Sequence, residues 1–341
     1  MINKNKVITI TNLSELNKYK NEITMAISKT TNPWFCFDAI KSMMLAYKNI
    51  YLVYINSIML CVFKKRNMDI LESMVDVEPI YNFKKDKSKN WYNIFDYLLE
   101  ITNSKAIYFP LVYEKSEFYK HFNKSPSFQN YKRLYTSICD IKDLNDVNKK
   151  MIYSYLHKNN INQINKLFCV ERYTRVNVID KLTKIEINSW KSVVQQDLVT
   201  KKEDLIFYNE MVKQGIVTCT ILEDKQNKTP IAYRLDYVEG NKLIQLKTSY
   251  NENYKKYKPG TYLLLYDLLR MQNIEHIDLY GGPNTIKNTI ETRKIDRYDF
   301  LYGENSCSEK LIENRINWDK RNWNNFIERK GIRNVYEEFK R

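Results

Sequence analysis

The residues whose types and spacing could do chemistry lie in the second half of the chain. Asp278 stands near the end of an expected strand at 276–280, and Gly281 and Gly282 follow it directly. All seven glycines lie after position 214, and a chain poor in glycine keeps it where positive φ or close approach to a ligand requires it. Sites of α/β proteins usually open at the carboxyl ends of strands. This pattern directs attention to residues 215–303, although Asp278 could also be only a strand-end cap.

A second group of residues has the character of an anion site. Pro259 and Gly260 open an expected helix at 259–271, and three lysines precede it. The first N–H groups of a helix lack partners within the helix, and its positive end attracts phosphate. The alternative is an ordinary helix-start turn. We therefore predict cofactor binding by Lys255, Lys256, Lys258, Gly260 and Thr261.

Composition limits the class of protein. The 341 residues, 43% of them hydrophobic, can bury a large core and form two domains of ordinary size. No apolar run approaches the ~20 residues that a membrane-spanning helix needs, and no signal region follows the N-terminus. The three histidines and six cysteines show no metal-ligand spacing. We expect a cytoplasmic protein with no membrane span and no metal, either a monomer or a weak dimer.

The net charge of +15 has two explanations. A polyanionic partner such as tRNA, or a phosphorylated cofactor, would attract a basic surface. The alternative is codon bias, because Lys, Asn, Ile and Tyr are all abundant in the chain. Bias does not require Lys to exceed Asp and Glu, so the charge weakly favours an anionic ligand.

Helices and strands alternate along the chain, which favours an α/β (α+β) layered sheet over a bundle or a sandwich. The first part is expected to contain a helix at 37–46, a hairpin at 51–63 and a helix at 90–101. In the second part we expect a strand at 172–178 and helices at 184–193 and 202–213. A polar stretch at 140–168 places a domain boundary near residue 145. The tail at 308–341 is basic, aromatic and expected to be helical, and it could pack on the second domain or contact RNA.

The segment 232–303 resembles the GNAT superfamily and, within it, the Fem-like branch of tandem GNAT proteins. The matching residues are Tyr257-Lys258-Pro259-Gly260 before the helix, then Asp278-Leu279-Tyr280-Gly281-Gly282, then Lys287. Motifs carry the resemblance over about 145–303, and layout alone carries it over 1–145. It implies two GNAT-like domains, 1–145 and 146–341, each a mixed twisted sheet flanked by helices. The first domain, which has no glycine, would be degenerate and serve the acceptor side or the structure.

The resemblance implies acyl transfer to an amine. Such a reaction needs a base for the nucleophile, a donor held still, and a cation or N–H groups at the oxyanion. Lys287 matches the lysine near the reacting carbonyl, Asp278 would orient the amine or act as base, and Tyr280 would be an acid or an acceptor contact. Substrate contacts are expected from the charged residues Arg234, Lys247 and Glu291. Each of these residues could instead belong to an ordinary solvated face.

Three functions remain open at this level. The first is an N-acyltransferase with an acyl-CoA-type thioester donor and a small-molecule or peptide amine acceptor. The second is a Fem-type aminoacyl-tRNA-dependent transferase that extends a peptide or cell-wall precursor. It is favoured by the charge and by the absence of the usual GNAT pyrophosphate loop, which 255–261 replaces. The third is a non-catalytic GNAT fold that binds RNA or a protein partner.

Overall fold

The computed structural model describes residues 7–27, 32, 34–55, 59–66, 69–75, 79–80, 91–144, 146–158, 161–193, 195–280 and 285–303. Within these ranges the strands form one mixed twelve-stranded sheet in the order β1-β2-β3-β4-β5-β12-β6-β11-β10-β9-β8-β7. The strands are β1 (Val7–Ile10), β2 (Ile50–Ile55), β3 (Met59–Arg66), β4 (Ile70–Ser73), β5 (Ala106–Tyr113), β6 (Phe128–Asp140), β7 (Phe168–Tyr173), β8 (Thr218–Asp224), β9 (Pro230–Glu239), β10 (Lys242–Tyr250), β11 (His276–Asp278) and β12 (Arg293–Gly303).

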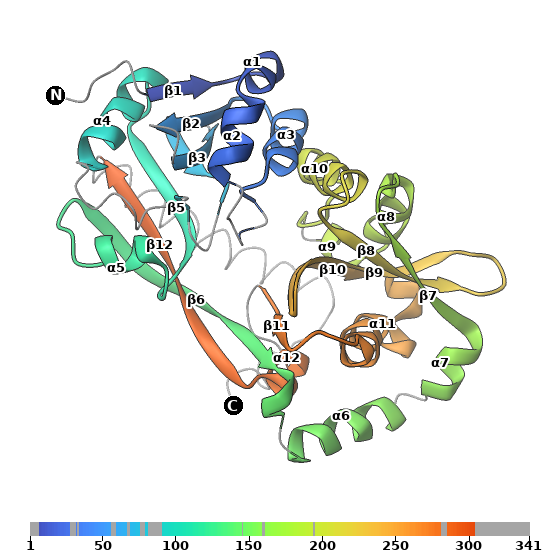
Figure 1. Cartoon of the computed structure of the whole chain (residues 1–341). Helices are drawn as coiled ribbons and strands as arrows, with labels where there is room; N and C mark the ends of the chain where they lie inside the picture. Colours follow the sequence, from blue (N-terminus) through green and yellow to red (C-terminus); the bar gives the residue numbers. More distant parts are fainter. Residues whose placement is uncertain are drawn as a thin grey trace.

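Helices flank this sheet in both halves of the molecule (Figure 1). They are α1 (Leu13–Lys18), α2 (Lys20–Ile27), α3 (Phe37–Ala46), α4 (Trp91–Thr102), α5 (Glu117–Phe122), α6 (Asp146–Lys158), α7 (Ile161–Leu167), α8 (Ile179–Glu186), α9 (Trp190–Val193), α10 (Lys202–Lys213), α11 (Pro259–Thr261) and α12 (Thr285–Ile290). The expected α/β class, with a mixed twisted sheet flanked by helices, is confirmed. No helix among the described residues is long and apolar enough to cross a membrane.

The N-terminal half is held together by an aromatic core. Helices α4 and α5 pack there on β5, β6 and β12. Rings meet edge to face or tilted, as aromatic pairs prefer; for example, the centroids of Phe109 and Phe118 are 4.7 Å apart. The cluster is completed by Phe95, Phe122, Phe128 and Phe300. This core fixes the strands that reach the candidate site.

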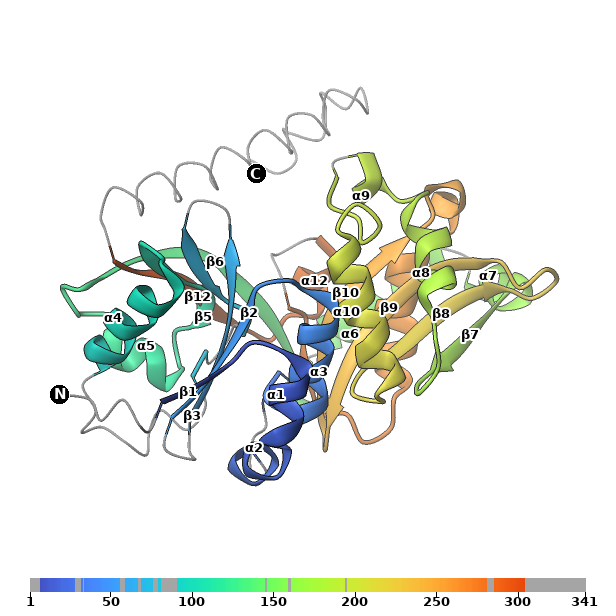
Figure 2. The same cartoon turned by 90° about the horizontal axis from the view of Figure 1, so that it is seen from above.

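The two halves are joined in two ways. Helix α3 packs against α10 in one shared apolar cluster, in which Trp34 stacks near Phe207 with centroids 5.8 Å apart. Figure 2 shows α3 beside α10 at this junction. The sheet is the second link, because β12 lies between β5 and β6, and β11 lies between β6 and β10. The domain boundary near residue 145 stays a prediction, and β12 lies among the strands of the first half. The tail at 308–341 lies outside the described residues.

The helical segment after β10 is irregular. It begins as α11, continues as a π-helix over Tyr262–Asp267 and ends as a 3₁₀ turn over Leu268–Arg270. The fully buried Arg234 of β9 donates to the carbonyl of Leu263 within the π-helix, at 2.5 Å. A side chain that takes a helical carbonyl disturbs the i→i+4 ladder, so Arg234 explains the irregularity. Its Nε also pairs with Asp236 at 2.7 Å.

Candidate active site

Asp278 stands where two parallel strands part. β10 and β11 pair over only three residues, from Lys242 opposite His276 to Ile244 opposite Asp278. Beyond this point β10 continues to Tyr250, whereas β11 ends. On its other side β11 pairs with β6 of the N-terminal half, with Asp278 opposite Ile138. The carboxylate therefore lies at the carboxyl end of a strand, where both halves of the chain meet.

Hydroxyl and amide groups surround the Asp278 carboxylate. Tyr113 donates from β5 to Oδ2, Thr136 donates from β6 to Oδ1 at 3.1 Å, and the amide of Tyr280 donates to Oδ1 at 2.9 Å. Burial raises the pKa of Asp278, while the hydrogen bond from Tyr113 and the positive charge of Arg297 oppose that rise. The net direction is upward, which makes this carboxylate a better base than an ordinary aspartate.

Lys287 lies on α12, nine positions after Asp278, and the charges of the two side chains act on each other. Its side chain is buried, and its ammonium donates to the carbonyls of Leu279 and Tyr280, at 2.5 and 2.9 Å. Burial lowers the pKa of Lys287 to about 8, although Asp278 acts in the opposite direction. Lys287 is thus a cation whose charge changes near neutral pH, and it holds the chain just after β11.

Tyr280 has an unusual backbone with φ of +20°. Its ring stacks on the guanidinium of Arg297, at 4.5 Å from ring centroid to Cζ, and the ring of Tyr113 stacks on the same guanidinium at 4.8 Å. The contributions of Tyr280 to the cluster are therefore a packed ring, an N–H group on Asp278 and a carbonyl on Lys287.

Three residues of this cluster escaped the sequence analysis: Tyr113, Thr136 and Arg297. They come from β5, β6 and β12, and only sheet pairing brings them to β11. One signal was present in the sequence. Pro110 interrupts the apolar run of β5, and a proline inside a strand indicates an edge or a bulge.

The expected substrate contacts are placed differently from one another. Glu291 accepts a hydrogen bond from the buried Ser137 and pairs with Lys294 at 3.4 Å. Successive side chains of a strand face opposite sides of the sheet, so Ser137 and Glu291 lie on the other face from Thr136, which binds Asp278. Lys247 of β10 lies over the ring of Tyr208 at 5.7 Å. Arg234 is fully buried and binds the carbonyl of Leu263 in the π-helix, so we assign it a structural role instead of a substrate contact.

Another lysine, Lys191, binds β10 and is affected by the charge of Lys287. Lys191 of α9 donates to the carbonyl of Thr248 at 2.5 Å. Burial lowers the pKa of Lys191 to about 8, Glu186 opposes this, and the charges of Lys247, Lys201 and Lys287 add to the lowering. These three lysines therefore lie near enough for their charges to act on Lys191.

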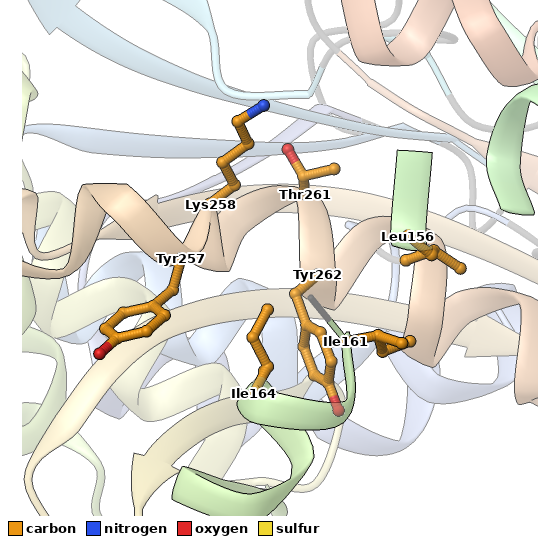
Figure 3. Close-up of a pocket in the computed structure, with 7 residues that line it drawn as sticks. All are labelled: Leu156, Ile161, Ile164, Tyr257, Lys258, Thr261 and Tyr262. Carbon is orange, nitrogen blue, oxygen red and sulfur yellow. The ribbon is translucent and has the colours of Figure 1, made fainter. Parts of the chain in front are cut away.

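The predicted anion site at the helix entrance is basic, and two of its lysines contact neighbouring side chains at the surface. Lys255 pairs with Glu252 at 3.7 Å, and Lys256 lies over Tyr257 at 4.8 Å. Lys258 takes the left-handed conformation with φ of +47° directly before α11. Figure 3 shows the ammonium of Lys258 and the hydroxyl of Thr261 pointing to the same side of a small recess whose other walls are Leu156, Ile161, Ile164, Tyr257 and Tyr262.

Gly260 has a packing reason at this entrance. A Cβ at this position would lie 3.4 Å from Cδ1 of Tyr250, the last residue of β10. The strand end therefore packs directly on the start of the helix. The space beside this glycine is occupied by a ring, so glycine itself is no sign of a phosphate there.

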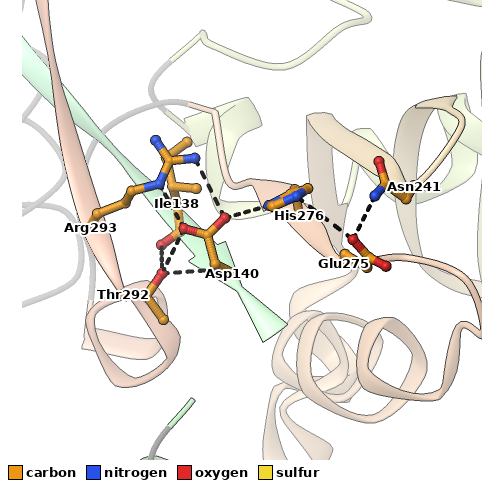
Figure 4. A network of polar contacts seen from close by, with 7 residues as sticks. All are labelled: Ile138, Asp140, Asn241, Glu275, His276, Thr292 and Arg293. Carbon is orange, nitrogen blue, oxygen red and sulfur yellow. Dashed lines mark hydrogen bonds and ion pairs between the residues drawn. The ribbon is translucent and has the colours of Figure 1, made fainter. Parts of the chain in front are cut away.

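A second carboxylate network lies at the other end of β11 (Figure 4). Asp140 of β6 accepts from Nε of Arg293 at 2.6 Å and contacts Nδ1 of His276 at 2.5 Å. Thr292 accepts from the amide of Asp140 at 2.9 Å. Burial by itself would raise the pKa of Asp140, but the hydrogen bonds from Arg293 and His276 outweigh it, and the pKa is lowered.

Comparison with known proteins extends the fold assignment. No family model matches the sequence, and no curated protein matches it either. Among solved structures, one similar chain is the C-terminal domain of a protein described as a lysylphosphatidylglycerol synthetase from Agrobacterium fabrum. Its TM-score is 0.61 at 8% identity, over 88% of this chain and 97% of that one.

Two further structures bear on the resemblance to tandem GNAT proteins. FemX has a TM-score of 0.53 at 11% identity, over 90% of this chain and all (100%) of that one. A tandem GNAT protein from the clavulanic acid biosynthesis pathway has a TM-score of 0.51 at 9% identity, over 86% of this chain and 98% of that one. The resemblance to the Fem-like tandem GNAT branch is confirmed at the level of the fold.

Proposed function

We propose that this protein is an N-acyltransferase whose reaction takes place where β10 and β11 part. The observation that supports this most is the position of Asp278, with its raised pKa, beside the buried cation Lys287 in a GNAT-type fold. The likeness to GNAT acyltransferases and to FemX supports a transferase at the level of the fold. The donor, the acceptor and the residue roles below belong to the proposal.

The reaction begins with an acceptor that arrives as an ammonium ion. Asp278 takes one proton, and the neutral amine attacks the carbonyl carbon of the donor. A new C–N bond forms, and a tetrahedral oxyanion develops that the positive charge of Lys287 stabilises. The bond from carbon to the leaving sulfur or oxygen then breaks, the leaving group takes up the second proton from the attacking nitrogen as the amide forms, and Asp278 releases the first proton to water. Every proton that the amine loses is thereby accounted for.

The donor is expected to lie along the helix entrance at 255–261. The exposed side chains of Lys255, Lys256 and Lys258 supply positive charge there. Such a surface suits the phosphates of an acyl-CoA thioester. Tyr250 and Gly260 pack against one another, so we assign the phosphate contacts to the lysines and to the backbone of Gly260 and Thr261.

A specific observation also favours the second candidate, an aminoacyl-tRNA donor. The net charge is +15, and the usual GNAT pyrophosphate loop is replaced by a lysine-rich turn. The structural likeness to FemX is in keeping with this donor. The catalytic residues would serve both donors, since an ester and a thioester carbonyl pass through the same tetrahedral oxyanion.

Titration calorimetry separates these candidates. The wild type would be titrated with coenzyme A and, separately, with deacylated tRNA. The same titrations would be run on Lys255→Glu/Lys256→Glu/Lys258→Glu. We expect one ligand to bind and the charge reversal to weaken it by about tenfold or more. As a matched control, Lys105→Glu/Lys124→Glu at exposed positions of the N-terminal half changes the net charge in the same direction. Equal weakening in both variants would refute the assigned donor site.

A further inference from the structure

The strand β5 contains a strained bulge close to the candidate site. Leu111 has φ of +54°, a conformation that is a true outlier for a bulky residue. Phe109 pairs with Phe300 and Val112 pairs with Tyr298, so Pro110 and Leu111 together oppose the single residue Asp299. Two residues against one define a β-bulge, and bulges next to active sites re-aim side chains.

Both backbone groups of Leu111 are bound by side chains of β12. Its amide donates to Oδ1 of Asp299 at 2.8 Å, and its carbonyl accepts from Nε of Arg297 at 3.1 Å. Asp299 and Arg297 are fully buried. Asp299 is itself held by hydroxyls of Tyr108 and Tyr131, at 2.5 and 2.8 Å. A strained conformation persists only when its surroundings hold it in place, and here two buried charged groups do so.

Arg297 contacts both the bulge and a residue of the candidate site. Tyr113 lies two residues after Leu111, pairs with Arg297 across the strands and stacks on its guanidinium. The hydroxyl of Tyr113 donates to Asp278. Side chains alternate along a strand, so the extra residue decides which face Tyr113 occupies. Without the bulge, Tyr113 would lie on the opposite face from its present one.

We propose that Arg297 and Asp299 form a clamp on the Leu111 bulge that positions Tyr113 against Asp278, through which the N-terminal half of the chain controls proton transfer at the site. The control of proton transfer rests on the proposed function. The clamp itself does not, because the contacts from Leu111 to Asp278 exist without any substrate. In this account Arg297 and Asp299 are positioning residues that act through Tyr113.

Charge and geometry make different predictions for Arg297. Its positive charge opposes the rise in the pKa of Asp278, and so does the hydrogen bond from Tyr113. Lysine keeps the charge but loses the planar guanidinium that both stacks on Tyr113 and bonds to Leu111. Arg297→Lys therefore removes the clamp and leaves the charge, whereas Tyr113→Phe removes only the hydroxyl.

The test is a double-mutant cycle of Arg297→Lys and Tyr113→Phe. Carbon-13 NMR follows the titration of the side-chain carboxyl groups of aspartate, and Asp278→Asn identifies the Asp278 signal. Both single variants are expected to raise the pKa of Asp278, and the double variant to raise it hardly further than Tyr113→Phe alone. Tyr92→Phe is the matched control, because that hydroxyl bonds to Ser125 at 2.7 Å and the variant should leave Asp278 unchanged.

Two results would overturn the clamp. One is a pKa of Asp278 in Arg297→Lys equal to that of the wild type. The other is a pKa change in the double variant equal to the sum of the changes in the two single variants. Leu111→Gly provides a second route, since glycine adopts positive φ without strain. In that background Arg297→Lys should fold and lose most of its effect on Asp278, and an undiminished effect would contradict the proposal.

Transfer activity separates this inference from the proposed function. If the protein transfers acyl groups, Tyr113→Phe and Arg297→Lys should each lower kcat about tenfold and move the acid limb of the rate profile to higher pH. If it transfers none, the proposed function fails, while the NMR cycle still decides whether the clamp exists.

Discussion

A carboxylate lies at each end of strand β11, and the pKa values of the two carboxylates shift in opposite directions. At its start, Asp140 faces Arg293, and at its end, Asp278 has Arg297 nearby. Both arginines come from β12, and β6 is the common neighbour strand. Yet the pKa of Asp140 is lowered and that of Asp278 is raised.

The balance between burial and positive partners explains why the two pKa values shift in opposite directions. Asp140 accepts directly from Arg293 and contacts His276, so positive groups outweigh its burial. Burial raises the pKa of Asp278 and outweighs the hydrogen bonds from Tyr113 and Thr136 and the positive charge of Arg297, all of which act in the opposite direction. An ion pair makes a carboxylate a structural link, whereas a carboxylate whose pKa is set mainly by burial keeps a raised proton affinity that chemistry can use.

The largest expected effect separates the two carboxylates directly. Asp278→Asn should lower kcat by about 10²- to 10⁴-fold, because amide cannot accept the proton, while the midpoint of thermal unfolding stays near that of the wild type. Asp140→Asn should do the reverse and lower the melting temperature with little change in kcat. Steady-state rates and calorimetric melting on the two variants test this, and equal loss of kcat in both would end the distinction.

The next effect concerns Lys287 and pH. Its pKa is lowered to about 8 by burial, so its ammonium is present below that pH and is lost as the pH rises through it. We expect kcat to fall above pH 8 in the wild type. Lys287→Arg, whose guanidinium stays charged, should abolish that fall, even if its rate is lower throughout. A base limb that survives in Lys287→Arg would assign the titration to another group.

The smallest effect is on stability at the Asp140 end. The pKa of Asp140 is lower in the folded state than in the unfolded state, so its contribution is present above the unfolded value and is lost as pH falls through the folded value. Arg293→Gln should cost about 1 kcal/mol of unfolding free energy at neutral pH, because Arg293 is partly exposed. The cost should vanish in acid. Urea unfolding at several pH values measures it, and a cost independent of pH would show that the pair is not its source.

Much of the fold followed from local pattern. The helix at 37–46, the hairpin after it and the helix near 90–101 were found as α3, β2 with β3, and α4. In each case amphipathic spacing and clear turn residues agree. The strand expected at 172–178 was wrong, since β7 spans Phe168–Tyr173. The helix expected at 184–193 was also wrong in its bounds, because α8 begins at Ile179 and α9 is a separate turn.

The candidate site could be predicted only in part. Asp278 was proposed from its place at a strand end beside scarce glycines, and Lys287 from the resemblance to the Fem-like branch. Tyr113 and Arg297 lie 165 and 19 positions from Asp278, and the sheet register that brings them together is a property of long-range pairing. Arg234 shows the converse, because a charged residue on a hairpin suggests solvent or substrate, yet it is buried against the carbonyl of Leu263.

The most direct test of the central claim is a transfer assay with a labelled acyl group. Wild type, Asp278→Asn and Asp140→Asn would each be given acetyl-CoA or aminoacyl-tRNA, with a panel of amine acceptors. The account predicts amide formation from one donor class, lost in Asp278→Asn and kept in Asp140→Asn. Transfer that survives in Asp278→Asn, or no transfer from either donor by a folded wild type, would contradict it.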